Sequence, residues 1–152
     1  MTLKILSINE KRKIQENLQE QFGITEIPGL LVKRGEERLF LFQGHLSPKQ
    51  IIELEDKIPL ERVGIYFAKM VRDEPKLSIE GVQILKNQIK KNIFEINQEQ
   101  AEQWMSGQEL NIKTGKKGFI ILKCGEDLLG CGNASEEKIT NFIPKSRRLK
   151  IK

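Results

Sequence analysis

Residues 118–132 have the sequence Gly-Phe-Ile-Ile-Leu-Lys-Cys-Gly-Glu-Asp-Leu-Leu-Gly-Cys-Gly. Two apolar runs, Phe119–Lys123 and Leu128–Gly132, flank the polar turn Gly125-Glu126-Asp127, a pattern typical of two strands joined by a tight turn. Gly130-Cys131-Gly132 is a bare Gly-x-Gly inside a strand, where glycine lets another strand or a ligand backbone approach closely. The stretch therefore predicts the centre of a compact, mainly β module in the C-terminal part of the chain.

Short apolar segments surround this hairpin. Ile93–Ile96 predicts a strand, and Asn97 caps a helix over Gln98–Met105 that ends at a glycine. Ile139–Ile143 and Leu149–Ile151 predict two further strands. Residues on both sides of the hairpin are thus expected to complete the β module.

The first half of the chain combines helical and strand patterns. Ser7-Ile8-Asn9-Glu10 has the spacing of a capping box, and apolar residues recur at helical spacing over residues 8–22. Leu30–Lys33 and Leu39–Phe42 predict a hairpin. Ser47-Pro48 begins a short helix that runs to about residue 55.

Val63–Val71 predicts a mostly buried strand, which the turn Arg72-Asp73-Glu74-Pro75 ends. A short strand at Leu77 is expected to run into a helix from about Glu80 to Lys90. The sequence therefore predicts an α+β fold, in which an N-terminal mixed α/β domain over residues 1–90 packs on a C-terminal β domain over residues 91–152.

Length and composition limit the class of protein. A chain of 152 residues, 38% hydrophobic and 31% charged, has room for one ordinary domain or two small ones sharing a core. No stretch reaches 18 apolar residues and the start lacks the apolar core of a secretory signal, so we expect no membrane span and a cytoplasmic location. Cys124 and Cys131 are too few for a disulfide scaffold and are expected as reduced, buried side chains on neighbouring strands.

Positive charge is concentrated near the carboxyl end. Residues 1–110 carry 16 Lys and Arg against 17 Asp and Glu, whereas residues 111–152 carry 10 against 4. From Lys138 to Lys152 there are six basic residues and no acidic one. This asymmetry indicates a polyanionic partner held by the C-terminal part, although a solvated, solubilising tail is an equally good interpretation of charge alone.

No catalytic constellation is visible. His45, the single histidine, lies in a predicted loop, and together with the two cysteines it makes no recognisable zinc set. Gly115-Lys116-Lys117 lacks the spacing and the hydroxyl of a phosphate-binding P-loop. Asp73 and Asp127 could each serve as an isolated base, but both lie in turns, where Asp is expected for backbone reasons. The sequence predicts no metal, no cofactor and no enzyme.

The basic C-terminal segment is the best candidate for a functional surface. If Arg147–Lys152 is a strand, Arg148, Lys150 and Lys152 point to one side as a basic row about 7 Å apart, which suits phosphate oxygens. Few aromatic residues are available to stack bases, Phe142 and Trp104 being the nearest, so recognition of nucleic-acid shape and backbone is favoured. The predicted phosphate-binding residues are Lys116, Lys117, Lys138, Lys145, Arg147, Arg148, Lys150 and Lys152.

The residues from 93 to the end resemble the PUA domain, a small β-barrel RNA-binding module. Gly118–Leu122, the Gly125-Glu126-Asp127 turn and Leu129-Gly130-Cys131-Gly132 carry the resemblance. The order of elements before them resembles the two-domain Nip-type ribosome biogenesis factors. The ending Ile143–Arg148 is similar to PUA-like proteins associated with the Nol/Nop/Fmu family of RNA methyltransferases.

These resemblances imply a C-terminal PUA-like β-barrel that binds rRNA or tRNA during rRNA maturation or RNA modification. They do not imply catalytic activity, because the Pro-Cys motif of those methyltransferases is absent at Cys124 and Cys131. The leading hypothesis is therefore a non-catalytic RNA-binding protein. The alternative is an interaction adaptor, whose N-terminal domain docks an RNA methyltransferase or a ribosome assembly factor.

Overall fold

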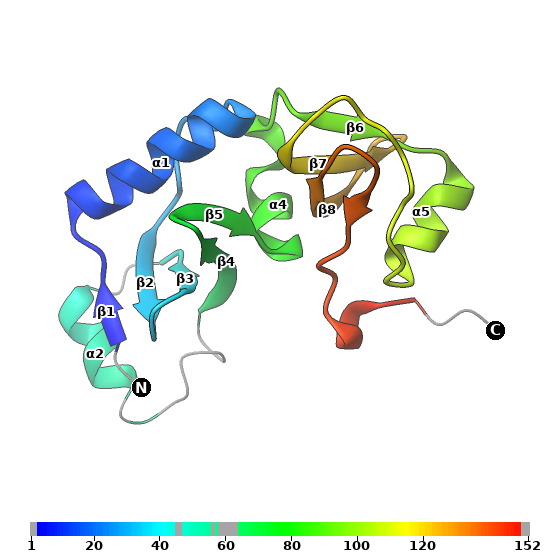
Figure 1. Cartoon of the computed structure of the whole chain (residues 1–152). Helices are drawn as coiled ribbons and strands as arrows, with labels where there is room; N and C mark the ends of the chain where they lie inside the picture. The colour runs from blue at the N-terminus through cyan, green and yellow to red at the C-terminus, as the bar shows by residue number, and fades with distance from the viewer. Residues whose placement is uncertain (1–2, 45–46, 56, 58–63, 150–152) are drawn as a thin grey trace.

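Two β-sheets lie side by side in the computed structural model of the chain, with a helix between them (Figure 1). The structure describes residues 3–44, 47–55, 57 and 64–149. The α+β class predicted from the sequence is confirmed. No helix in these described ranges is both long and apolar enough to cross a membrane.

The first sheet is an antiparallel meander of five strands in the order β1-β2-β3-β4-β5. Its strands are β1 (Leu3–Ile5), β2 (Leu30–Arg34), β3 (Arg38–Phe42), β4 (Ile65–Val71) and β5 (Glu74–Leu77). The β2–β3 pair is the hairpin that the sequence predicts. The short strand β1 was not predicted, because three residues carry too little periodicity to stand out.

Two helices cover opposite faces of this sheet (Figure 1). Helix α1 (Ile8–Phe22) begins with the predicted capping box and ends at Gly23, whose φ of 80° is the left-handed conformation that favours glycine. Its buried side chains join the core on one face. Helix α2 (Pro48–Glu55) contributes Ile51 to a smaller apolar cluster on the other face.

The second sheet is mixed and has the order β6-β7-β8-β9. Strand β6 (Ile93–Glu95) runs parallel to β7 (Gly118–Cys124), whereas β8 (Asp127–Ala134) and β9 (Ile139–Thr140) are antiparallel to their neighbours. Helix α5 (Gln98–Met105) has the predicted Asn97 cap and packs the fully buried Trp104 against this sheet. Trp104 is therefore core and unavailable for base stacking.

One apolar cluster crosses from the first sheet to the second. Phe119, Ile121 and Cys131 of the second sheet belong to the same buried cluster as α1 and the first sheet. Helix α4 (Ile79–Leu85) and the 3₁₀ turn η1 (Lys86–Gln88) lie between the sheets, and α4 contributes to the cluster. The chain crosses from one sheet to the other close to residue 90, and the two halves share their core.

The predicted C-terminal strands are shorter than expected or wrong. Strand β9 stops at Thr140 because the Asn141 side chain donates to the carbonyl oxygens of Trp104 and Gln108 and turns the chain away. Residues Lys145–Arg147 form the 3₁₀ turn η2 after Pro144, so the predicted strand over residues 147–152 is wrong in its described part. The predicted helix to Lys90 ends at Leu85 and continues as η1. His45 lies outside the described residues.

Gly132 fills the role predicted for the Gly-x-Gly stretch. A Cβ atom at this position would lie 2.7 Å from Cγ2 of Ile139 and 2.8 Å from Cη2 of Trp104, both fully buried. Because both neighbours are fixed in the second core, they cannot move aside without cost.

We therefore expect Gly132→Ala to lower the free energy of unfolding by about 1–3 kcal/mol, measured by urea denaturation. Gly44→Ala is the matched control, since no heavy atom lies within 4 Å of its added Cβ. Equal stability of the two variants would contradict the close packing at Gly132.

Candidate nucleic-acid interface

The second sheet brings three of the predicted lysines to one end. Gly118 pairs with Ala134, and Ala134 pairs with Ile139, so the residues before β7 and before β9 are neighbours. Lys116 and Lys117 precede the first of these strands, and Lys138 precedes the second.

Two of these lysines form ion pairs at the surface. Nζ of Lys117 lies 3.5 Å from Glu136, and Nζ of Lys138 lies 3.0 Å from Glu109. All four side chains are substantially exposed, so each pair is worth little and can exchange its carboxylate for a phosphate.

The C-terminal basic residues do not form the predicted row. Arg147 donates to the carboxylate of Glu80 on α4, whereas Nε of Arg148 donates to the carbonyl of Ile143 at 3.0 Å and packs beside Gly107. Lys145 lies in η2 and is exposed. Lys150 and Lys152 lie outside the described residues. The two arginines are thus directed to different neighbours, and their contact with RNA stays a prediction.

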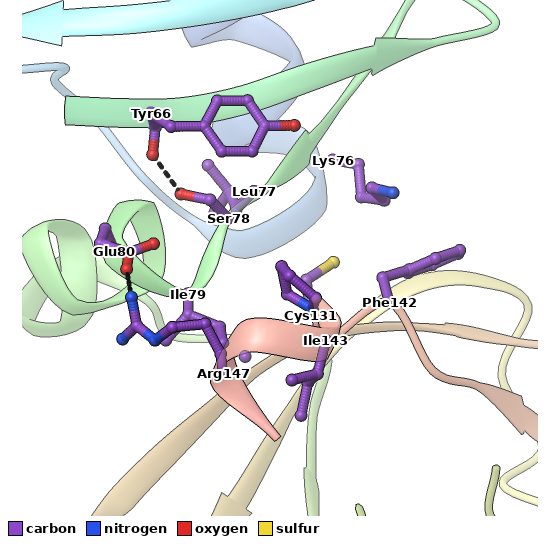
Figure 2. A pocket seen from close by; sticks show the side chains of 12 residues that line it. Tyr66, Lys76, Leu77, Ser78, Ile79, Glu80, Cys131, Phe142, Ile143 and Arg147 are labelled. Atoms are coloured by element: carbon purple, nitrogen blue, oxygen red, sulfur yellow. Dashed lines mark hydrogen bonds and ion pairs between the residues drawn. The ribbon is translucent and has the colours of Figure 1, made fainter. Parts of the chain in front are cut away.

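A groove of about 570 Å³, open to solvent, lies between the two sheets (Figure 2). Tyr66, Lys76 and Ser78 line it from the first sheet and the segment that follows. Cys131 of β8 and Phe142 of the C-terminal segment line the opposite side. The apolar walls carry a few polar groups at the rim, an arrangement typical of a binding groove.

Lys76 and Phe142 meet across the junction of the sheets. Nζ of Lys76 lies 3.9 Å from the centroid of the Phe142 ring, which is the geometry of a cation–π contact. That ring packs edge-on against Phe119, with 6.4 Å between the two ring centroids. Burial lowers the pKa of Lys76, and the nearby charge of Lys69 lowers it further. A partly desolvated ammonium group interacts more strongly with an incoming anion than a fully hydrated one does.

Phe142 also lines a second groove. This groove of about 880 Å³ includes Arg72, Asn133 and Thr140, and it reaches Gly118 at the start of β7. The two grooves therefore meet at Phe142 and extend from α4 to the lysine-bearing end of the second sheet.

Two side chains of the groove could act as nucleophiles, and one is engaged in hydrogen bonds while the other is protonated. The Ser78 hydroxyl donates to the carbonyl of Tyr66 at 2.5 Å and accepts from the N–H of Gly81, the role of a helix cap. Burial raises the pKa of the Cys131 thiol to about 12. Asp73 lies in a turn, as expected, whereas Asp127 was expected in a turn and is the first residue of β8.

Within the described ranges, no three His, Cys, Asp or Glu side chains are grouped to hold a metal ion. The groove thus offers cations and aromatic rings for binding. Sequence reasoning missed Tyr66 and Lys76, because no local pattern connects residue 76 to residue 142. The one available signal was the alternation Glu-Pro-Lys-Leu over residues 74–77, which predicts a strand with Lys76 on the face opposite Pro75 and Leu77.

The mixed sheet β6–β9 and helix α5 enclose one apolar cluster. Residues 91–149 match the family model of the methyltransferase RsmF PUA domain. This part of the chain belongs to that PUA family, as the resemblance in its glycine-rich hairpin predicted.

Similarity to curated proteins extends into the first half of the chain. The ribosomal RNA small subunit methyltransferase F of Shewanella oneidensis is 28% identical over 141 residues, which are 91% of this chain. The protein of the same name from Psychromonas ingrahamii is 26% identical over 142 residues, which are 90% of this chain. The chain spans 28% of the length of each of these relatives.

The two thiols should differ sharply in reactivity. Cys131 is buried with a raised pKa, whereas Cys124 is half-buried and makes only a long contact, 3.8 Å, to Oε1 of Gln98. At pH 8 the folded protein should react with a thiol reagent at Cys124 and not at Cys131.

The Cys124→Ser variant should show no reactive thiol when folded and one after denaturation. The Cys131→Ala variant is the control and should keep the reactive thiol of the folded protein. Rapid labelling of Cys131 in the folded Cys124→Ser variant would contradict the burial described above.

Proposed function

We propose that this chain is a non-catalytic RNA-binding protein of ribosomal RNA maturation or RNA modification, acting in the cytoplasm. It contacts the RNA backbone through the basic surface of its PUA domain. The observation that carries the proposal is the match of residues 91–149 to the PUA domain of a methyltransferase family. The relatives named above are ribosomal RNA methyltransferases, which favours rRNA as the substrate class.

The RNA is held by side chains at the end of the second sheet and along the C-terminal segment. Lys116, Lys117 and Lys138 lie together where β7 and β9 begin. Lys145, in η2, and Arg148, directly after it, add to this cationic surface. Phosphate groups replace the exposed carboxylates of Glu136 and Glu109, whose ion pairs are each worth at most about 1 kcal/mol.

The proposal also states that this chain does not catalyse a reaction. The hydroxyl of Ser78 serves as a helix cap and the thiol of Cys131 stays protonated, so neither attacks a substrate. Most of each relative's length has no counterpart within this chain, which spans 28% of it. We infer that the catalytic residues of those relatives lie in that remaining length.

We also propose that residues 1–90 and 91–152 are two domains that share a core. The family match begins at residue 91, next to the point where the chain passes between the sheets. The apolar cluster formed by α1, the first sheet and β7 keeps the domains together.

A second candidate function is that of an adaptor for an RNA methyltransferase or an assembly factor. The relatives favour it, since the counterpart of this chain is joined there to the rest of a methyltransferase. A pull-down from lysate with and without nuclease separates the two functions. Partners bridged by RNA are lost on digestion, whereas a docked protein stays bound.

Neutralising the lysines at the end of the second sheet should weaken RNA binding. The triple variant Lys116→Gln/Lys117→Gln/Lys138→Gln should lose about tenfold or more in affinity for a structured rRNA fragment, measured by fluorescence anisotropy. The log–log salt slope should become shallower by about 2–3, because each lost phosphate contact removes about 0.7–0.9.

The matched control is Lys86→Gln/Lys90→Gln/Lys91→Gln, which removes the same charge from exposed positions around η1, away from both grooves. Circular dichroism verifies that both variants are folded. Equal affinity of the two triple variants would refute the assignment of these lysines to RNA.

A further inference from the structure

We propose that a basic row on the first sheet, outside the PUA domain, is a second stretch of the RNA-binding surface and takes the phosphates of a single strand. The basic row consists of Arg34, Arg38, Lys69 and Lys76. This inference rests on the proposed function and adds a site that lies outside the family match at residues 91–149.

The strand register places these four residues in line. Arg34 pairs with Arg38, Arg38 pairs with Lys69, and Lys69 pairs with Lys76, across β2, β3, β4 and β5. Directly paired residues of an antiparallel sheet point to the same face. At a strand spacing of about 4.8 Å, the basic row is about 14 Å long.

The row lies on the face opposite the main core. The next aligned set along the strands, Leu39, Ala68 and Leu77, is almost fully buried in the cluster with α1. Successive residues of a strand alternate between faces, so Arg38, Lys69 and Lys76 point away from that cluster.

Like charges directly opposite one another destabilise a sheet, and this sheet has three such pairs in succession. Partial compensation is present within the fold. Glu37 lies 3.5 Å from Nζ of Lys69, and the guanidinium group of Arg38 lies 5.9 Å from the ring centroid of Tyr66. Arg34 is half-buried and has interactions of its own. The part of the row available to a ligand is therefore Arg38, Lys69 and Lys76.

The position of the row favours RNA over an acidic protein segment. The row ends at Lys76, which lies over the ring of Phe142 in the PUA domain and lines the groove between the sheets (Figure 2). Tyr66 lines the same groove and packs beside Arg38. Cations alternating with aromatic rings suit a nucleic-acid strand, whose phosphates and bases need both, whereas a run of carboxylates needs only the cations.

The test compares Lys69→Gln/Lys76→Gln with the control Lys90→Gln/Lys91→Gln in the full chain. Both control lysines follow η1 and lie beside the end of α1, on the opposite side of the sheet, and their backbone N–H groups donate to the carbonyl oxygen of Phe22 independently of the side chains. The probes are a fluorescent 20-nucleotide single-stranded oligouridine and a polyglutamate peptide. Binding is measured by anisotropy between 50 and 300 mM salt, and thermal unfolding by circular dichroism.

The row variant should bind the RNA about fivefold or more weakly than the control, with a salt slope shallower by about 1.4, since single-strand contacts contribute about 0.7 each. Its melting temperature should equal that of the control, because the removed repulsion between Lys69 and Lys76 offsets the loss of the Glu37 ion pair and the Phe142 contact. Arg38→Gln, at an exposed position away from the Phe142 ring, should also weaken RNA binding. This variant tests the inference if the double variant unfolds.

RNA affinity of the row variants equal to that of the control would overturn the inference. Tight polyglutamate binding that these substitutions abolish would also overturn it, in favour of an acidic protein partner. If the lysine triple variant of the PUA domain loses RNA binding while the row variants keep it, only this inference fails. If the unmodified chain binds no RNA, the proposed function fails as well.

Discussion

The packing of the second sheet against the first determines every surface discussed above. Helix α4 lies directly on β4, since a Cβ atom at Gly81 would be 2.4 Å from the carbonyl oxygen of Phe67. The hydroxyl of Ser78 fixes the start of the same helix to Tyr66. On the other side, Phe119 and Cys131 enter the core of the first sheet. The groove between the sheets is the part of this junction that apolar side chains leave unfilled.

The same junction also positions the C-terminal segment. Glu80, at the start of α4, accepts from Arg147, and the carbonyl of Met105 at the end of α5 accepts from the N–H of Leu149. These bonds come from helices on either side of the segment. A chain held in this way cannot extend as an edge strand, which explains the 3₁₀ turn after Pro144.

Two helices with local signals were predicted from the sequence with their correct bounds. Residues 8–22 and 98–105 are helices because caps and apolar periodicity lie within the segments themselves. The glycine-rich hairpin was predicted for the same reason. The end of β9 depends instead on Asn141 bonding to Trp104, and the cation–π contact joins residue 76 to residue 142. Such long-range partners are invisible to periodicity, so the groove could not be predicted.

Charge counted along the chain is a poor guide to charge on the surface. The excess in residues 111–152 is real, yet Lys117, Lys138 and Arg147 each meet a carboxylate. The segment before it is nearly neutral in sum, yet the sheet register aligns four cations on one face. Exposed ion pairs exchange partners at little cost, whereas cations held in register against their own repulsion gain most from an anion. Because Lys76 belongs to the first sheet and the Phe142 ring beneath it to the C-terminal segment that follows the second sheet, a strand bound at that point would contact both halves at once. Binding would then stabilise the packing between the sheets, since a ligand that contacts both halves favours the state in which they are joined.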